Sequence, residues 1–445
     1  MSRKTVVIVV EVVNRELDNA ILLKTELERR GYRVVIRNKW EQLRFGRTDI
    51  LITPNCYNRD NYEYYRYRFN AKSGLLIDLQ YEQVLSLAEE DNELYSLDET
   101  AKQVMHLCWG RHTFDRLRRK NVAPEKLPIT GAIQLDSARP MFTACLKTRR
   151  EIAGEYGLPS GKKWLLYISS FACAEDSLIS DVQKNCHELD NVDVFAAITS
   201  RSQQETLQWF ERFLEENGEE YVIIYRPHPV ELSSAPVREL MEKYPESFRC
   251  ISDYEIKQWI RVADVPCTWL STSIAESYFM KKNCLVLRPA RIPPEVDCVI
   301  YEGVRAAESY EEFLSQVKEY RSDVENFPIR RERIEYYYEP EEEPAYRKIA
   351  DVIDACVPNP DAGKGFGKKR REYLLRNHVL SKLAVKAVYR FLYRTTGWKL
   401  KSEALRSRFF VEEWEKTVDN RTNHKKHIQE KETALRQLLK EADRS

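Results

Sequence analysis

Glycine is scarce in this sequence, and its placement argues against two common nucleotide-binding motifs. The chain has 14 glycines among 445 residues, and none lies in Val12–Asp18, soon after the apolar run Val6–Val10. A dinucleotide fingerprint needs glycines where the backbone approaches pyrophosphate, so NAD-type oxidoreduction is not expected. The glycines at 363–367 follow a Pro-containing linker and lack the Gly-Lys-Ser/Thr of a P-loop, so they predict a hinge.

The sequence also lacks the features of a disulfide-linked, zinc-binding or membrane-spanning protein. Its ten cysteines are scattered singly, with no Cys-x-x-Cys pair, which favours reduced thiols in a cytosolic protein. No apolar run approaches the ~18 residues that a membrane span needs. No secretion signal is expected, because charges return at Glu11 and Arg15. These absences predict a cytoplasmic protein.

Charge is balanced overall but divided unevenly along the chain. There are 71 Lys and Arg against 70 Asp and Glu, for a net charge of +1. Segment 364–408 holds 14 basic and two acidic residues and carries +12; the remainder, with 57 basic and 68 acidic residues, carries −11. A basic segment on an acidic body indicates one anionic partner that binds at one place.

Strand-like and helix-like segments alternate in two successive series. The first opens with Val6–Val10, a β-branched run typical of a strand buried on both faces of a parallel sheet. The second opens with Trp164–Ile168, after the linker signal Gly157–Gly161, and basic helix without strands follows residue 360. We therefore predict an α/β protein with two Rossmann-like domains facing across a cleft, plus a C-terminal basic helical extension. The predicted boundaries are 1–156, 157–345 and 346–445.

A loop in the second half carries side chains suited to a phosphate-bearing ligand. Arg226 and His228 follow the predicted strand Tyr221–Tyr225, at the edge where open α/β sheets bind ligands. Arg226 can fork onto a phosphate, and His228 can donate to a phosphate or ribose oxygen. The alternative interpretation is a histidine satisfied within a turn.

A second loop offers hydroxyl groups at the start of a helix. Ser271, Thr272 and Ser273 follow the predicted strand that begins at Val265. Hydroxyls and free amides at a helix N-terminus form an anion site without glycine, although ordinary helix capping is the alternative. Glu276 lies one turn further on, where its carboxylate can accept hydrogen bonds from sugar hydroxyls, such as those of a ribose.

Together these motifs resemble GT-B glycosyltransferases of bacterial surface-polysaccharide assembly. The group includes the surface carbohydrate biosynthesis proteins and, more remotely, polysialyl- and CDP-glycerol-type transferases. The resemblance covers residues 1 to about 345. It rests on the two loops above and on the segments Arg15–Asp18, Leu22–Leu23, Arg30–Tyr32, Trp109–Gly110 and Thr130–Asp136.

The resemblance implies a division of labour between the two predicted domains. Residues 1–156 would present the acceptor, and residues 157–345 would hold the nucleotide donor. By this analogy His228, Ser271, Thr272 and Ser273 contact phosphate, and Glu276 contacts the ribose.

No Asp-x-Asp pair occurs anywhere in the sequence. Metal-dependent transferases of the other fold use such a pair to hold Mg²⁺ or Mn²⁺ on the diphosphate. We therefore expect no metal and no cofactor. Arg, His and helix dipoles would neutralise the phosphate charge instead.

If displacement is inverting, the acceptor hydroxyl needs a base. Related polysialyltransferases carry an acidic pair before a glycine, and the corresponding stretch here, Asp78–Gln83, lacks both. Glu82 is the first candidate base, with Glu16 and Asp18 as rivals. A structural salt bridge is the alternative for each carboxylate.

Two further residues are candidates for contact with phosphate or acceptor. Ser169 and Ser170 follow the first strand of the second half, so they would face the same cleft.

The C-terminal extension has an amphipathic pattern. Lys382, Lys386, Arg390 and Arg394 repeat every four residues and form one stripe of a helix. Apolar residues occupy another face: Leu380, Leu383, Ala384, Ala387, Val388 and Phe391. This pattern predicts an interfacial helix on anionic lipid, with docking onto the acidic body as the alternative. Residues 412–445 are charged with little apolar content and predict a solvated or partly frayed helix.

The sequence as a whole predicts a metal-independent glycosyltransferase, peripheral on the inner face of the plasma membrane. It would move a sugar from a nucleotide-sugar donor to a surface polysaccharide or lipid-linked glycan acceptor. Segment 364–408 would contact the anionic membrane, and nucleic acid is not an expected partner. The alternatives are a CDP-alcohol phosphotransferase resembling teichoic-acid polymerases, a sugar-nucleotide epimerase, and a non-catalytic membrane-associated scaffold.

Overall fold

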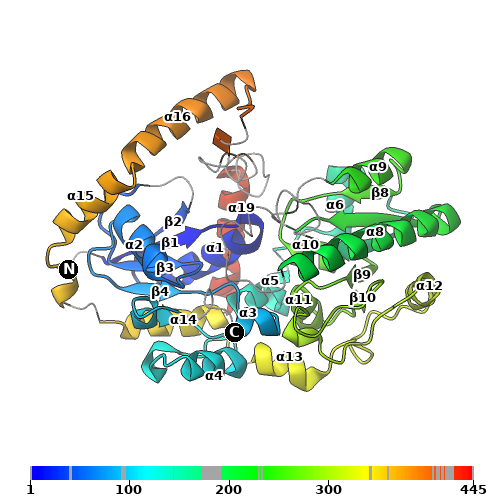
Figure 1. Cartoon of the computed structure of the whole chain (residues 1–445), viewed down its shortest axis with the longest axis horizontal. Helices are drawn as coiled ribbons and strands as arrows, with labels where there is room; N and C mark the ends of the chain where they lie inside the picture. The colour runs from blue at the N-terminus through cyan, green and yellow to red at the C-terminus, as the bar shows by residue number, and fades with distance from the viewer. Residues whose placement is uncertain are drawn as a thin grey trace.

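Two five-stranded parallel sheets form the body of the molecule, shown in Figure 1 as a computed structural model. The structure describes residues 3–39, 43–91, 97–143, 145–171, 192–228, 231, 234–339, 343–357, 360–402, 405–406, 411, 415 and 425–442. The sheets and their helices confirm the predicted fold class of two Rossmann-like domains with a helical C-terminal region.

The first sheet has the order β2-β1-β3-β4-β5. Its strands are β1 (Thr5–Val10), β2 (Arg33–Asn38), β3 (Ile50–Thr53), β4 (Leu76–Asp78) and β5 (Met105–His106). The helices that follow them are α1 (Val13–Arg29), α2 (Arg59–Arg68), α3 (Leu87–Asp91) and α4 (Arg111–Arg119). Every residue of β1 is buried, because Val6 and Ile8 pack in the core that contains α1 whereas Val7 packs in the core that contains α2.

The second sheet has the order β10-β9-β6-β7-β8. Its strands are β6 (Lys163–Ile168), β7 (Tyr221–Arg226), β8 (Phe248–Cys250), β9 (Val265–Thr268) and β10 (Leu285–Val286). Its helices are α8 (Val192–Asn217), α9 (Ala235–Lys243), α10 (Ile256–Val262), α11 (Ile274–Phe279) and α12 (Tyr310–Lys318). Two short helices, α5 (Pro140–Thr143) and α6 (Arg149–Tyr156), connect the sheets along the chain.

After the second sheet the chain returns to the first domain. Helix α13 (Arg331–Tyr337) packs on α4, and α14 (Ala345–Ala355) packs on α1. The backbone N–H groups of Ala345 and Tyr346 donate to the Asp136 carboxylate at 3.0 and 2.7 Å, so this aspartate caps α14. Because α14 packs on α1, the chain end of the predicted 157–345 domain leads directly into the first domain.

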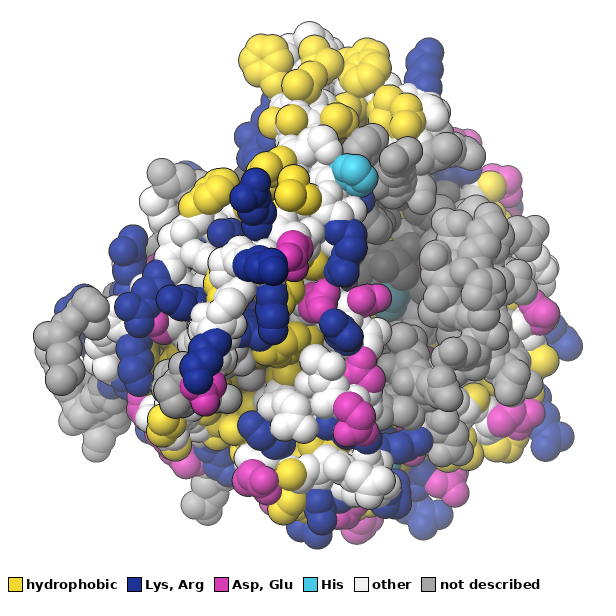
Figure 2. All heavy atoms as spheres, turned by 60° about the vertical axis from the view of Figure 1, so that its left-hand side comes forward, with side chains coloured by type: hydrophobic (Ala, Val, Ile, Leu, Met, Phe, Trp, Pro, Cys, Tyr) yellow, Lys and Arg dark blue, Asp and Glu magenta, His cyan; other side chains and the backbone are white. Residues whose placement is uncertain are grey.

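The basic extension begins on the first domain and then leaves it. Helix α15 (Phe366–Arg376) packs on α2, where Phe366 and Tyr373 contact the ring of Tyr67. Helix α16 (Val379–Thr396) rises away from the sheet in Figure 1. Figure 2 shows hydrophobic side chains gathered at the top of the molecule, where α16 lies. Among the described residues, no helix combines the length and the hydropathy that crossing a membrane requires.

The prediction of a solvated helix within 412–445 is wrong for the part that the structure describes. Helix α19 (Lys425–Ala442) packs along α1, and Leu435 and Leu439 are buried in its core. Together with half-buried Ile428 and Leu438, they form one apolar stripe that the surrounding charges conceal in the sequence. The stripe explains why this helix docks.

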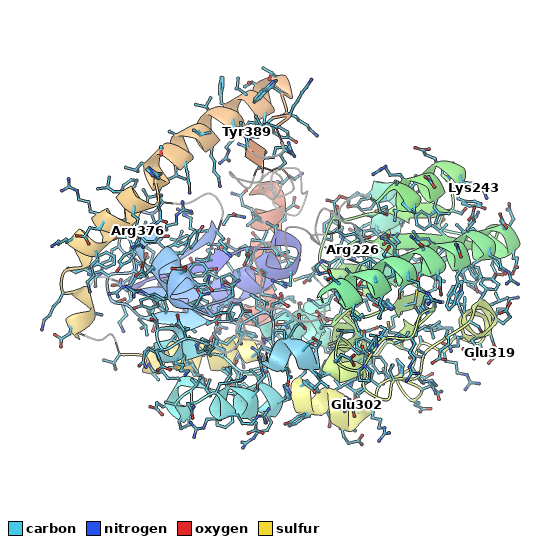
Figure 3. All side chains as sticks on the ribbon, viewed as in Figure 1. Arg226, Lys243, Glu302, Glu319, Arg376 and Tyr389 are labelled. Atoms are coloured by element: carbon cyan, nitrogen blue, oxygen red, sulfur yellow. The ribbon has the colours of Figure 1, made fainter. Side chains whose placement is uncertain are left out.

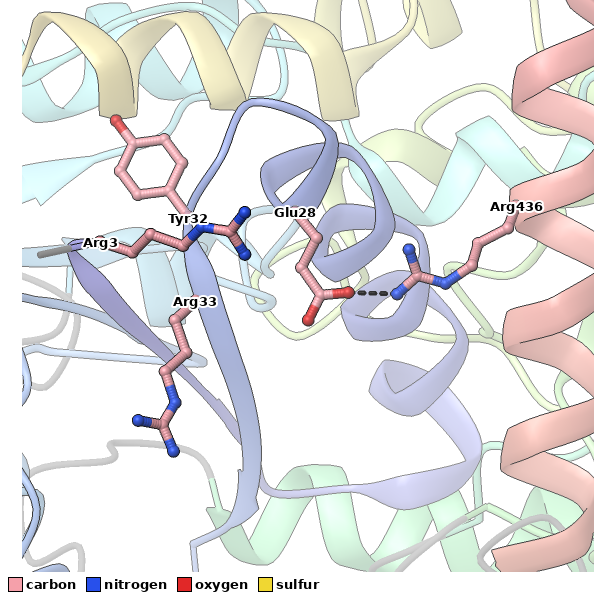
Figure 4. Close-up of a pocket in the computed structure, with 5 residues that line it drawn as sticks. All are labelled: Arg3, Glu28, Tyr32, Arg33 and Arg436. Carbon is pink, nitrogen blue, oxygen red and sulfur yellow. Dashed lines mark hydrogen bonds and ion pairs between the residues drawn. The ribbon is translucent and has the colours of Figure 1, made fainter.

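Ion pairs flank the apolar contact between α1 and α19. Lys431 pairs with Asp18, and Glu432 pairs with Lys24. Figure 4 shows Arg436 of α19 reaching Glu28 of α1, beside a cavity of about 390 Å³ that Arg3, Tyr32 and Arg33 also line. This cavity lies by the first residues of β1 and β2, at the amino edge of the first sheet.

Candidate functional site

Three loops leave the second sheet at the same edge. Strand β6 lies between β7 and β9, and Ile168 at its end is in register with Arg226 of β7 and Thr268 of β9. Neighbouring strands are ~4.8 Å apart, so the ends of β7 and β9 are about 10 Å apart. The segment that carries His228 and the segment Ser271–Ser273 therefore follow strand ends only two strand spacings apart. This is the edge where open α/β sheets bind ligands.

Hydrogen bonds tie the loop after β6 to both neighbours. Ser170 Oγ accepts from the N–H of Leu270 at 3.2 Å, on the β9 side. Ser169 Oγ donates to Glu231 at 2.7 Å, and the same carboxylate oxygen accepts from the N–H of His228 at 2.9 Å. Sequence reasoning missed Glu231, because an isolated acidic residue in a loop resembles a solvated one.

Arg226 is held by backbone carbonyl groups at the end of β7. Its guanidinium donates to the carbonyl oxygens of Ile251 at 3.2 Å and Asp253 at 2.5 Å, and also to that of Tyr254. Burial lowers the pKa of Arg226 to about 10. In Figure 3 it lies at the end of β7 nearest the first domain. Its contacts hold the 251–254 loop and do not support the predicted fork onto phosphate.

Three hydrogen bonds fix the position of the segment before α11. Thr268 Oγ1 accepts from the N–H of Ser271, and Ser271 Oγ accepts from the N–H of Ser273, each at 3.2 Å. The Tyr301 hydroxyl donates to the carbonyl of Ser271 at 2.6 Å. Thr272 is exposed, and no side-chain hydrogen bond from Ser273 caps α11 in the described structure. Thr272 is thus the most exposed of the three, and Ser271 and Ser273 are both half-buried.

Glu276 lies in the first turn of α11, in a charged environment. Burial raises its pKa, while the positive charges of Lys257 and Arg15 act in the opposite direction. Arg15 belongs to the first domain, so charged groups of both domains influence this carboxyl. Lys257 is itself buried and forms an ion pair with Glu255 at 3.0 Å.

Arg15 organises the first domain's side of the site. It lies in the first turn of α1 and forms ion pairs with Glu16 at 2.9 Å and with Glu82. Glu16 is almost fully buried and also accepts from the N–H of Glu11 at 2.7 Å. Burial raises the pKa of Glu16. Sequence reasoning missed Arg15, although its place beside Glu16 directly after a strand was a usable signal.

The three candidate bases differ in their surroundings. Glu82 is the most exposed, with 46 % of its side chain accessible, and its ion pair with Arg15 brings it to the site. Glu16 is enclosed, and Asp18 is paired with Lys431 of α19. A structural ion pair therefore accounts for each of the three, and accessibility singles out Glu82.

No family model matches the sequence, and no curated protein does either. The fold is nevertheless similar to solved structures. The wall teichoic acid polymerase TagF matches with a TM-score of 0.52 and 13% identity, covering 80% of this chain and 89% of that chain. MnaA from S. aureus, solved with UDP, matches at 0.48 and 12%, covering 79% and 96%. The UDP-GlcNAc 2-epimerase of Methanocaldococcus jannaschii, in complex with UDP-GlcNAc and UDP, matches at 0.46 and 10%, covering 80% and 100%.

These identities are low, so the likeness concerns the fold. The two-sheet architecture and its similarity to TagF confirm the GT-B-like fold that the resemblance implied. The narrower resemblance to surface carbohydrate biosynthesis proteins stays a prediction.

Proposed function

We propose that this protein is a metal-independent glycosyltransferase that moves a sugar from a nucleotide-sugar donor to a surface polysaccharide or glycolipid acceptor. One observation carries the proposal. The loops after β6, β7 and β9 meet at one sheet edge, and α11, which follows the last of these loops, shares a hydrophobic core with α1 of the other domain.

The second domain holds the donor in this proposal. His228 and the hydroxyls of Ser271, Thr272 and Ser273 bind the phosphates, and Glu276 accepts hydrogen bonds from the ribose. Ser169 and Ser170 join the two loops and can offer a further contact. Since Arg226 is occupied by backbone carbonyls, it shapes the 251–254 loop rather than binding phosphate.

The first domain presents the acceptor and the base. Glu82 takes the proton from the acceptor hydroxyl, whose oxygen attacks the anomeric carbon of the donor sugar as the bond to the diphosphate breaks. Arg15 holds Glu82 through an ion pair and offers positive charge near the leaving group. Glu16 and Asp18 remain the alternative bases.

Nucleotide binding by titration calorimetry tests this function. We expect one of CMP, CDP, UDP and GDP to bind, with EDTA making no difference. In Glu276→Gln the affinity falls about 10- to 100-fold, as expected for losing a charged hydrogen-bond acceptor worth ~1.5–3 kcal/mol. The matched control is Glu242→Gln, on the exposed side of α9. If no nucleotide binds, the non-catalytic scaffold becomes the better interpretation.

A CDP-alcohol phosphotransferase is the second candidate, because TagF shares the fold and the same loops would hold a cytidine nucleotide. In that reaction the acceptor oxygen attacks phosphorus, and CMP leaves. Product analysis separates the two functions: phosphorus in the new linkage supports the phosphotransferase, and its absence supports sugar transfer.

The proposal includes a membrane partner. The face of α16 that carries Leu380, Val388 and Phe391 is exposed, whereas Val379 and Tyr389 on the opposite side are buried. The basic residues of the same helix lie to one side of this stripe, with Arg394 exposed and Lys382, Lys386 and Arg390 half-buried. Basic and exposed apolar side chains on one helix suit an anionic lipid surface. The protein would then be peripheral on the inner face of the plasma membrane, where a lipid-linked acceptor is within reach.

A further inference from the structure

A second cavity lies where both domains and the last helix meet. It measures about 210 Å³ and is lined by residues of α1, of α10 with the segment before it, and of α19. Asp18 comes from α1, Glu255 precedes α10, and Lys431 and Ala434 come from α19. No motif in the sequence points to this cavity, because its walls come from four segments that lie more than 100 residues apart in the chain.

The carboxylates on its walls have open hydrogen-bond acceptors. Asp18 Oδ1 and Glu255 Oε1 are buried and have no hydrogen-bond partner among the described residues, whereas Glu255 Oε2 lies 3.0 Å from the ammonium group of Lys257. Glu255 itself is 4 % exposed. A buried acceptor left unsatisfied costs ~1–3 kcal/mol, so a ligand that donates hydrogen bonds here is favoured.

The charges on the walls are already compensated. Asp18 is paired with Lys431, Glu255 with Lys257, and Lys147 with Glu155. An ion entering the cavity would therefore find no uncompensated opposite charge. A neutral ligand that both donates and accepts hydrogen bonds is the better match.

Hydroxyl groups have this property, because each donates one hydrogen bond and accepts others. Carboxylates can accept from them, and the lysine ammonium groups can donate to them. The volume exceeds the ~30 Å³ of a water molecule and falls short of the ~300–1,000 Å³ of drug-sized ligand pockets. This range suits one sugar ring. Tyr254 also lines the cavity and can pack against the apolar face of such a ring.

We propose that this cavity is a sugar-binding subsite, which takes either the donor's sugar or one unit of the acceptor glycan. This inference deepens the proposed function and rests on it. The cavity is close to the candidate site, because Glu255 directly precedes α10, which packs against α11, the helix that carries Glu276. Asp18 lies one helical turn beyond Arg15 on the same face of α1.

The test fills the cavity without altering its charges. Ala434→Leu places a larger side chain at the α19 wall, and Thr433→Leu, exposed on the same helix, is the matched control. Calorimetry compares UDP with UDP-N-acetylglucosamine and GDP with GDP-mannose. Saturation-transfer NMR measures free N-acetylglucosamine and mannose. Glu255→Gln removes one open acceptor as a second variant, and its thermal unfolding is recorded to confirm that it folds.

A donor subsite predicts that a nucleotide sugar binds at least tenfold more tightly than its bare nucleotide, and that Ala434→Leu abolishes this difference but Thr433→Leu does not. An acceptor subsite predicts no such difference, but a free-sugar signal that Ala434→Leu removes. If neither variant of the cavity changes any sugar signal, or if no sugar binds, the inference is overturned. If free sugar binds but no nucleotide does, the subsite stands and the proposed function fails.

Discussion

Lys431 in the last helix forms an ion pair with Asp18 in the second turn of the first helix, 413 residues earlier in the chain. This contact fixes the C-terminal end of the protein to the helix that also carries Arg15 and Glu16. The last helix is therefore part of the body rather than a solvated tail.

The first prediction concerns the stability that α19 contributes. Leu439 is fully buried between α19 and the first domain, so Leu439→Ala is expected to destabilise the protein by about 2–5 kcal/mol. Lys440→Ala, at an exposed position one residue on, is expected to change the free energy of unfolding by less than about 0.5 kcal/mol. Urea denaturation measures both. Equal effects would mean that α19 does not pack as described.

A second prediction concerns Glu231, which joins the loops after β6 and β7. One Glu231 oxygen accepts from Ser169 and from the N–H of His228, and the other accepts from the Tyr225 hydroxyl. In Glu231→Gln an NH2 group replaces one oxygen and cannot accept, so the donors on that side lose their acceptor. We expect the affinity for the nucleotide that binds the wild type to fall at least tenfold. Glu239→Gln, exposed on α9, is the control. An unchanged affinity would show that the position of these loops does not matter for binding.

Much of the fold is predictable from the sequence, because its strands are continuous apolar runs. Val6–Val10 and Tyr221–Tyr225 are buried on both faces of parallel sheets, and this burial is what such runs indicate. The docking of α19 is harder to predict from the sequence. Its apolar stripe is sparse, and its partner lies more than 400 residues away, so local composition indicates solvent exposure.

Part of the candidate site is predictable from the sequence and part is not. Strand order and register place His228 and Ser271–Ser273 at one edge, as their positions after strands lead one to expect. The role of Arg226 is not predictable, since an arginine at a strand end suits a phosphate as well as a cluster of carbonyls. Only the path of the 251–254 loop decides between them. The place of Glu255 is not predictable from the sequence either, because its cavity forms from four distant segments.

A third prediction concerns the pH dependence of stability. Burial raises the pKa of Asp136 to about 6, although the N–H groups of α14 favour its ionised form. The unfolded chain has an ordinary value of ~3.9, so the folded protein binds a proton between these values that the unfolded chain does not. The contribution of Asp136 therefore increases as the pH falls from about 6 to about 4, and it is lost as the pH rises through 6.

Asp136→Asn isolates this contribution, because it removes the titration while other buried carboxyls remain in both proteins. Between pH 7.5 and pH 4, the stability of the wild type should rise relative to the variant by roughly 2–3 kcal/mol. Urea denaturation at the two pH values measures the change. A difference that stays constant with pH would contradict the assigned pKa shift.

The fourth prediction concerns the exposed face of α16. If it binds membrane, the wild type should sediment with vesicles of phosphatidylcholine containing 30 mol% phosphatidylglycerol, and less with phosphatidylcholine alone. Phe391 and Leu380 are 67 % and 57 % exposed, and burying each in lipid is worth ~1.5–3 kcal/mol. The double variant Leu380→Glu, Phe391→Glu is therefore expected to bind anionic vesicles at least tenfold more weakly. Met241→Glu, at an exposed apolar position on α9, should bind like the wild type. Equal sedimentation of the double variant and the wild type would instead favour another partner for this stripe, such as a second protein.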